Sequence, residues 1–247
     1  MELPDGLISD LRNARKVLVL TGAGMSAESG VPTFRDAQTG LWAKYRAEDL
    51  ATPQAFRDNP QNVWDWYAER RNKIREVSPH AGHAALVNLE QYFESFLLVT
   101  QNVDSLHQRA GSNEVVELHG NIMRFICSET GKVINDDWIK TNPGRPPASP
   151  HHSHGLARPG VVWFGEQLPA GVMERAMSEA SACDVCFSIG TSTLVQPAAY
   201  LPFVAQNSGA VVIEVNPTPT SLSSVARYSL QTTAASALTT IATKMAR

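Results

Sequence analysis

Three stretches of this 247-residue sequence contain residue types that could bind or transform a charged ligand. The first is the turn Gly22-Ala23-Gly24, which follows the apolar and β-branched run 17–21 and precedes small residues that could start a helix. A strand, a glycine turn and a helix start bring backbone N–H groups together, and such turns commonly bind a dinucleotide pyrophosphate. The glycines do not fit the G-x-G-x-x-G spacing, and no acidic residue follows about 20 positions later. A tight turn without a ligand therefore remains the alternative.

Polar residues also follow two predicted strands further along the chain. Gln101-Asn102-Val103-Asp104 comes directly after the run 96–100, and His119-Gly120 follows 114–118. Ligands of open α/β sheets bind at the carboxyl ends of parallel strands, so these side chains are predicted to lie at one edge. His119 is a candidate for proton transfer there, although a lone histidine is as often structural.

The helix predicted over 61–77 carries a basic residue on its apolar face. The residues that form its inward face are spaced four and three positions apart. They are Val63, Tyr67, Arg70, Ile74 and Val77. A buried guanidinium is costly unless an anion lies beside it. Tyr67 and Arg70 could bind one carboxylate together. The alternative is that Arg70 pairs with an internal acidic residue or extends to solvent.

Helical and strand patterns alternate through the chain and must position these groups. Strands are predicted over 17–21, 96–100, 114–118, 158–166, 184–189 and 210–215, and helices over 3–15, 61–77, 80–93, 170–182 and 234–245. This alternation predicts an α/β fold, a Rossmann-like doubly wound parallel sheet with a small inserted subdomain. A single domain 1–247 would consist of a large part formed by 1–35, 96–120 and 166–247, a helical insertion 36–95 and a loop-rich insertion 121–165.

Composition excludes several classes of partner. The formal net charge of −3 provides no electrostatic reason to expect nucleic acid or an anionic membrane. No apolar run approaches the ~20 residues of a membrane span, and the N-terminus lacks the apolar core of a signal peptide. Three cysteines do not indicate a disulfide framework. Cys183 and Cys186 are expected to be core residues on opposite faces. We expect a cytoplasmic monomer.

The ordered motifs GAGMS, GVPTFR, TQNVD, HG, VVWFGE, GTS and VNP resemble those of the sirtuins, which are NAD-dependent protein lysine deacylases. They extend from Gly22 to Asn216, so the resemblance covers nearly the whole chain. It implies that NAD is the cofactor and that acylated lysine side chains of proteins are the substrate, with nicotinamide and O-acyl-ADP-ribose as products. Two alternatives remain: mono-ADP-ribosyl transfer from the same cofactor, and a non-catalytic protein that responds to NAD.

The resemblance also implies roles for individual residues. His119 would be the general base, Asn102 would hold the nicotinamide ribose and a water molecule, and Asp104 would bind the carboxamide. The other NAD-binding positions would be Gly22, Ala23, Gly24, Ser26, Ala27, Pro32, Phe34, Arg35, Gln101, Val103, Gly190, Thr191, Ser192, Asn216 and Ala235. The substrate peptide would pair as an added strand, opposite the loop near Val195, with Val162, Trp163, Phe164, Gly165 and Glu166.

Tyr67 and Arg70 match the Tyr-x-x-Arg pair of the sirtuin branch that removes succinyl and malonyl groups. The resemblance therefore implies that the anion beside Arg70 is the distal carboxylate of an acyl chain. Desuccinylase and demalonylase activity would then accompany deacetylase activity.

The sequence departs from the family at the structural zinc site. Sirtuins usually hold this zinc with two Cys-x-x-Cys pairs. Here Cys127 stands alone, with Thr130 at its partner's position, and 149–154 contains no cysteine. A mixed set of Cys127, His151, His152 and His154 would bind a metal loosely at best. We therefore predict no metal ligands and no structural zinc.

Overall fold

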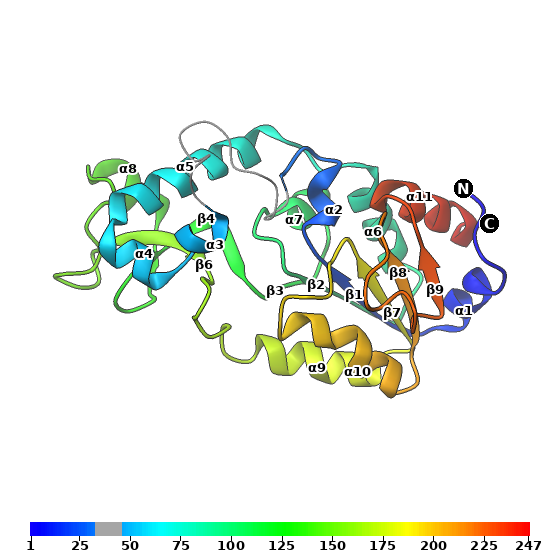
Figure 1. The fold of residues 1–247 in the computed structure, drawn as a ribbon. Coiled ribbons are helices and arrows are strands. Elements are labelled where there is room, and N and C mark those ends of the chain that lie inside the picture. Colours follow the sequence, from blue (N-terminus) through cyan, green and yellow to red (C-terminus); the bar gives the residue numbers. More distant parts are fainter. Residues whose placement is uncertain (33–45) are drawn as a thin grey trace.

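The computed structural model describes residues 1–32 and 46–247. Its centre is a six-stranded parallel sheet of order β3-β2-β1-β7-β8-β9 (Figure 1). The strands are β1 Lys16–Thr21, β2 Ser95–Thr100, β3 Val115–Glu117, β7 Val185–Ile189, β8 Val211–Val215 and β9 Tyr228–Leu230. The strand order reverses between β1 and β7, as in doubly wound nucleotide-binding folds. The predicted fold class is confirmed.

Both faces of this sheet are covered by helices (Figure 1). Val19 and Leu98 belong to a core that includes residues of α1 (Leu7–Asn13), α6 (Ala81–Glu90) and α11 (Ala234–Met245). Leu18 and Leu97, their neighbours along the strands, pack on the opposite face with α9 (Val172–Ala182) and α10 (Leu201–Asn207). Burial on both faces explains why these strands are continuous apolar runs in the sequence.

A smaller group of elements lies beside the carboxyl ends of the parallel strands and is seen at the left of Figure 1. It contains an antiparallel sheet of order β5-β4-β6 and several helices. The elements are α3 Ala47–Leu50, α4 Pro53–Asp58, α5 Pro60–Glu76, β4 Gly120–Cys127, β5 Val133–Ile134, α8 Asp136–Thr141 and β6 Ala157–Val161. Trp66 of α5, Ile122 of β4 and the buried Trp163 belong to its core. The short elements α2 Gly24–Ala27, α7 Leu106–Ala110 and η2 Ala198–Tyr200 lie in the connections that follow β1, β2 and β7.

The structure corrects three details of the sequence analysis. Segment 121–157 was expected to be loop-rich but contains most of the eight-residue β4, whose register shifts between Asn121 and Phe125 and hides the alternation. The strand predicted over 158–166 ends at Val161. Cys183 and Cys186 are buried as expected, but both pack in the core beside α9 and α10. The alternation argument was wrong because Cys183 caps α9 and precedes β7.

No helix among residues 1–32 and 46–247 is long and apolar enough to cross a membrane.

Candidate active site

A cavity of about 1500 Å³ lies at the carboxyl ends of β1, β2 and β7, between the parallel sheet and the smaller group of elements. Nearly all of the site residues predicted from the sequence that the structure describes line it. They are Gly22, Ala23, Gly24, Ser26, Pro32, Tyr67, Arg70, Gln101, Asn102, Val103, Asp104, His119, Val162, Trp163, Phe164, Gly165, Glu166, Gly190, Thr191, Ser192, Val195 and Asn216. The cavity therefore occupies the point where the strand order reverses, the expected ligand site of such a sheet.

Four predicted site residues are not among the described residues that line the cavity. Ala27 is exposed and Ala235 is half-buried, and neither lines the cavity. The Ala235 N–H instead donates to Oε2 of Glu28, at 2.8 Å. Phe34 and Arg35 lie outside the described residues.

The glycine turn after β1 packs closely against the turn after β7. The N–H groups of Gly22 and Gly24 donate to the carbonyl oxygens of Ile189 and Gly190, at 2.9 and 2.8 Å. A Cβ atom on Gly190 would lie 2.3 Å from the Met25 backbone nitrogen, so a side chain would separate the turns. Among the described residues no backbone carbonyl accepts the Ala23 N–H. Several N–H groups of this turn were expected to be available to an anion, but those of Gly22 and Gly24 are already used.

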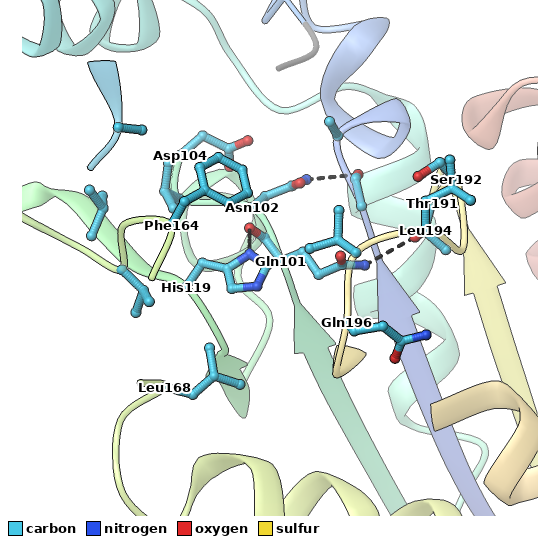
Figure 2. Close-up of a pocket in the computed structure, with 18 of the residues that line it drawn as sticks. Gln101, Asn102, Asp104, His119, Phe164, Leu168, Thr191, Ser192, Leu194 and Gln196 are labelled. Carbon is cyan, nitrogen blue, oxygen red and sulfur yellow. Dashed lines mark hydrogen bonds between the residues drawn. The ribbon is translucent and has the colours of Figure 1, made fainter. Parts of the chain in front are cut away.

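His119 is held in a defined tautomer by the backbone of the neighbouring strand end. Its Nδ1 atom lies 3.0 Å from the carbonyl oxygen of Gln101, and Figure 2 shows this contact beside Asn102. A carbonyl oxygen only accepts hydrogen bonds, so Nδ1 carries the proton and the Nε2 lone pair remains available as a base. Burial lowers the pKa of His119, although the Gln101 carbonyl opposes this. The ring is therefore neutral at pH 7.

Asn102, Ser26 and Asp104 form a hydrogen-bonded group in the same cavity as His119. The Asn102 amide donates to the Gly22 carbonyl oxygen at 3.0 Å and to the Ser26 hydroxyl at 3.1 Å. The Ser26 hydroxyl donates to Asp104 at 2.7 Å, and the Leu106 N–H donates to the other carboxylate oxygen at 2.8 Å. Burial raises the pKa of Asp104, whereas these two hydrogen bonds lower it and leave the net shift upward. These hydrogen bonds fix the side chains of Asn102 and Asp104 in place.

A second set of polar contacts lies at the ends of β7 and β8. Gln101 donates to the Thr191 hydroxyl at 3.1 Å, and Asn216 donates to the Thr191 carbonyl oxygen at 2.9 Å (Figure 2 shows the first contact). Ser192 lines the cavity beside them. These contacts join three strand ends into one polar rim.

Glu214 was not predicted from the sequence, although it supports this rim. It lies within β8 and is 2 % exposed. Its carboxylate accepts hydrogen bonds from the hydroxyls of Thr220, Ser223 at 2.5 Å and Ser229 at 2.8 Å. Thr220 lines the cavity, so Glu214 anchors a cavity-lining loop to the sheet. A carboxylate inside the apolar run 211–215 was the available signal, because a buried charge needs partners.

Tyr67 and Arg70 lie one helical turn apart on α5, at the end of the cavity formed by the smaller group of elements. Tyr67 is 5 % exposed, and its hydroxyl oxygen accepts the indole N–H of Trp163 at 3.0 Å. Burial raises the pKa of Tyr67, so the phenol is neutral. Burial lowers the pKa of Arg70, which the neighbouring Tyr67 opposes. The predicted pair therefore faces the same cavity as His119.

Arg71 is the more deeply buried arginine of this helix and was missed. It is 4 % exposed, its Nε–H donates to the Ile122 carbonyl oxygen at 2.9 Å, and its guanidinium carbon lies 4.3 Å from the Phe125 ring centroid. Burial lowers its pKa to about 10. Arg71 lies outside the periodic face of α5 and packs against β4, where it joins the helix to the smaller sheet.

Segment 162–166 was predicted to pair with a substrate peptide, and most of its N–H groups are already used. Val162 and Phe164 donate to the carbonyl oxygens of His119 and Ala51, at 2.8 and 2.9 Å. The N–H of Trp163 donates to the Glu166 carboxylate, and that of Glu166 to the Trp163 carbonyl oxygen. Among the described residues only the Gly165 N–H in this segment has no acceptor. An added strand would thus find a narrower pairing edge than expected.

The residues at the zinc position of the family do not fit a zinc ion. No three His, Cys, Asp or Glu side chains come together as ligands within the described part of the chain. Burial raises the pKa of the Cys127 thiol, but hydrogen bonds with Ser149 and Thr130 outweigh this and lower it. The Nε2–H of His151 donates to the Val133 carbonyl oxygen at 2.8 Å. Hydrogen bonds from hydroxyl groups and to backbone carbonyl oxygens therefore join the loops around Cys127 and His151, which a zinc ion would hold in other members of the family.

Comparisons with known proteins agree with this fold. The sequence model of the Sir2 family matches residues 22–197. An NAD-dependent protein deacylase of Ralstonia nicotianae is 52% identical over 213 residues, which cover 86% of this chain and 85% of the relative. An NAD-dependent protein deacylase of Aquifex aeolicus is 50% identical over 211 residues, covering 85% and 87%.

Solved structures resemble the chain over almost its full length. A Sir2 homologue in complex with NAD has a TM-score of 0.90 and 41% identity and covers 99% of this chain and 94% of its own. A Sir2 complex with a p53 peptide and NAD⁺ has a TM-score of 0.84 and 27% identity, with 97% of each chain covered. The chain belongs to the Sir2 family of enzymes.

Proposed function

We propose that this chain is an NAD-dependent protein lysine deacylase that accepts acyl groups ending in a carboxylate, such as succinyl and malonyl, as well as acetyl. The observation that carries the proposal is that Tyr67 and Arg70 line the same cavity as His119, Asn102 and Asp104. The relatives named NAD-dependent protein deacylases and the Sir2–NAD complex support the coarser part of it. The acyl preference rests on Tyr67 and Arg70 alone.

The described residues fit NAD. The close packing of the glycine turns against each other leaves a polar rim of hydroxyls and amides, from Gln101, Thr191, Ser192 and Asn216, suited to ribose and adenine. Asn102 and Asp104 would hold the reactive end of the cofactor. When bound, NAD supplies an electrophilic ribose carbon and nicotinamide as leaving group.

The protein's own contribution to the reaction is proton transfer and positioning. The Nε2 lone pair of neutral His119 would accept the proton of a ribose hydroxyl, because Nδ1–H is held by the Gln101 carbonyl oxygen. The Asn102 amide, oriented by Gly22 and Ser26, would position the hydroxyl and the attacking water. Segment 162–166 would hold the peptide through the Gly165 N–H.

The acyl chain would extend toward α5. Its distal carboxylate would meet the Arg70 guanidinium and the Tyr67 hydroxyl, which are one turn apart. A charged pair in a largely buried site discriminates strongly between acyl groups, because a succinyl or malonyl group brings a carboxylate to these donors and an acetyl group brings none.

The test is NAD-dependent nicotinamide release from one peptide carrying acetyl-, succinyl- or malonyl-lysine. We expect activity on all three, and Arg70→Met should lower kcat/KM for the succinyl peptide at least about tenfold while changing that for the acetyl peptide less than about twofold. Arg75→Met, an exposed arginine on the same helix, is the matched control. An equal loss on both peptides would show that Arg70 is structural.

The same assay separates the two alternative functions. Nicotinamide release with transfer of ADP-ribose to protein, and no free lysine product, would indicate mono-ADP-ribosyl transfer. NAD binding without nicotinamide release from any peptide would indicate a non-catalytic protein. The polar group formed by Asn102, Ser26 and Asp104 beside a neutral His119 favours the deacylase.

A further inference from the structure

The contact between Trp163 and Tyr67 has a fixed direction. The indole nitrogen of Trp163 lies 3.0 Å from the Tyr67 hydroxyl oxygen, and the two residues are 2 % and 5 % exposed. An indole N–H can only donate, so the tyrosine oxygen must accept. The single phenolic proton is therefore left to point elsewhere, and no acceptor for it lies within hydrogen-bond distance among the described residues.

Tyr67 is a neutral phenol in this environment, so it still carries its hydroxyl proton and can donate it to a ligand. Burial raises its pKa, and this effect exceeds the lowering by the Trp163 hydrogen bond and by the nearby Arg70 and Arg158. A buried hydroxyl proton without an acceptor is unfavourable. Because Tyr67 lines the cavity, a ligand atom is the partner that can satisfy it.

The orientation of the Trp163 ring is fixed from several sides. The Arg158 guanidinium carbon lies 3.4 Å from the centroid of the indole, and the Phe56 ring centroid lies 5.3 Å away. Arg158 binds Glu166 through both carboxylate oxygens, at 2.5 and 2.8 Å. Glu166 also accepts the backbone N–H of Trp163 at 2.8 Å. The indole N–H therefore has little freedom to turn away from Tyr67.

We propose that Trp163 is a specificity-determining positioning residue for acidic acyl groups, because its indole N–H occupies the Tyr67 oxygen and directs the Tyr67 proton to the distal carboxylate of the acyl chain. This inference rests on the proposed function and adds a residue to it. Without the indole donor, the tyrosine hydroxyl can rotate and satisfy its proton elsewhere, so the carboxylate loses a pre-oriented donor.

The first experiment compares Trp163→Phe with the unaltered protein on one peptide carrying succinyl- or acetyl-lysine. Phenylalanine keeps an aromatic ring and removes the N–H. We expect Trp163→Phe to raise the ratio of the succinyl-peptide KM to the acetyl-peptide KM about three- to tenfold, because the lost donor acts only on the distal carboxylate. Trp138→Phe is the matched control, since its indole N–H donates to the Ala148 carbonyl oxygen away from the cavity.

A double-mutant cycle with Tyr67→Phe separates an effect on the direction of the Tyr67 proton from an effect on the packing of the Trp163 ring. If Trp163 acts through the tyrosine proton, Trp163→Phe should add less than twofold to the loss of succinyl kcat/KM already caused by Tyr67→Phe. Multiplicative losses, or equal losses on both peptides for Trp163→Phe, would overturn the proposal.

The same variants also distinguish a failure of this proposal from a failure of the proposed function. If Arg70→Met and Tyr67→Phe lose succinyl activity selectively and Trp163→Phe does not, the acyl preference stands and the role of Trp163 is wrong. If none of the three variants is selective, the acyl preference itself is wrong, and the role of Trp163 with it.

Discussion

The carbonyl oxygen of Gln101 lies 3.0 Å from Nδ1 of His119 and leaves Nε2 as the basic atom of the ring. The same strand end thus orients the base through its backbone and places the polar side chains of Asn102 and Asp104 beside it. A backbone acceptor cannot be lost by substitution of its side chain. The tautomer of His119 is therefore a property of the fold.

The pH dependence of deacylation should reflect the buried state of His119. Burial lowers its pKa below the ordinary value of 6.5, so the base form persists to lower pH than free imidazole. We expect the acidic limb of kcat/KM to be centred below pH 6.5. An acidic limb centred above pH 6.5 would contradict this assignment.

Removal of the imidazole should separate chemistry from binding. His119→Ala is expected to lose at least about 100-fold in deacylation, the usual contribution of a general base. Calorimetric affinity for ADP-ribose should change less than about threefold, because the polar rim is intact. Full turnover by the variant would refute the role of His119.

Glu214 should influence cofactor binding without touching the chemistry. Glu214→Gln removes the charge that accepts three hydroxyl hydrogen bonds and loosens the loop carrying Thr220. We expect KM for NAD to rise about three- to tenfold and kcat to change less than twofold. Glu94→Gln, at an exposed surface glutamate, is the control. An unchanged KM for NAD would show that the loop is held independently of Glu214.

The protein should be stable without zinc. Cys127 faces hydroxyl groups of Ser149 and Thr130, and the adjoining loops are joined by bonds such as Ser128 N–H to the Leu156 carbonyl oxygen at 2.9 Å. We expect metal analysis of untagged protein to find far less than one zinc per chain, and EDTA to leave Tm unchanged. Stoichiometric zinc, or a clear fall in Tm with EDTA, would contradict this prediction.

Two buried histidines should make the fold sensitive to acid. His83 and His107 are 0 % and 1 % exposed, with ring centroids 5.0 Å apart. Burial and neighbouring histidines, including His80, lower the pKa of each to about 3. The unfolded chain binds these protons from about pH 6.5 downward, so stability is full above pH 6.5 and declines as pH falls toward 3. At pH 5 the loss is about 2 kcal/mol per histidine.

Urea unfolding at pH 7.5 and pH 5 measures this loss. His107→Gln removes one titrating ring and should reduce the difference in unfolding free energy between the two pH values. His151→Gln, at an exposed histidine, should leave it unchanged. The explanation fails if His107→Gln and the unaltered protein show the same difference.

Several features of the site were accessible from the sequence. Runs such as 17–21 and 96–100 are apolar throughout because parallel strands are buried on both faces, and the polar residues that follow them necessarily meet at one edge. The basic residue among apolar neighbours on α5 predicted that Arg70 would need an anion or an acidic partner, and the distal carboxylate of an acyl chain stays a prediction for that role. The carboxylate within the strand 211–215 held a similar signal that was overlooked.

The sequence by itself determined the doubly wound fold, the polar edge and the candidate base, because apolar periodicity and strand-end chemistry are local properties. Only the tertiary structure decided which donors remain available there. The N–H groups of Gly22 and Gly24 donate to carbonyl oxygens at the end of β7 and in the turn after it. Those of Val162 and Phe164 donate to distant carbonyl oxygens, and the Tyr67 oxygen accepts the indole N–H of Trp163, 96 residues away. Hydrogen-bond partners so far apart in the chain are set by packing, which no local pattern records.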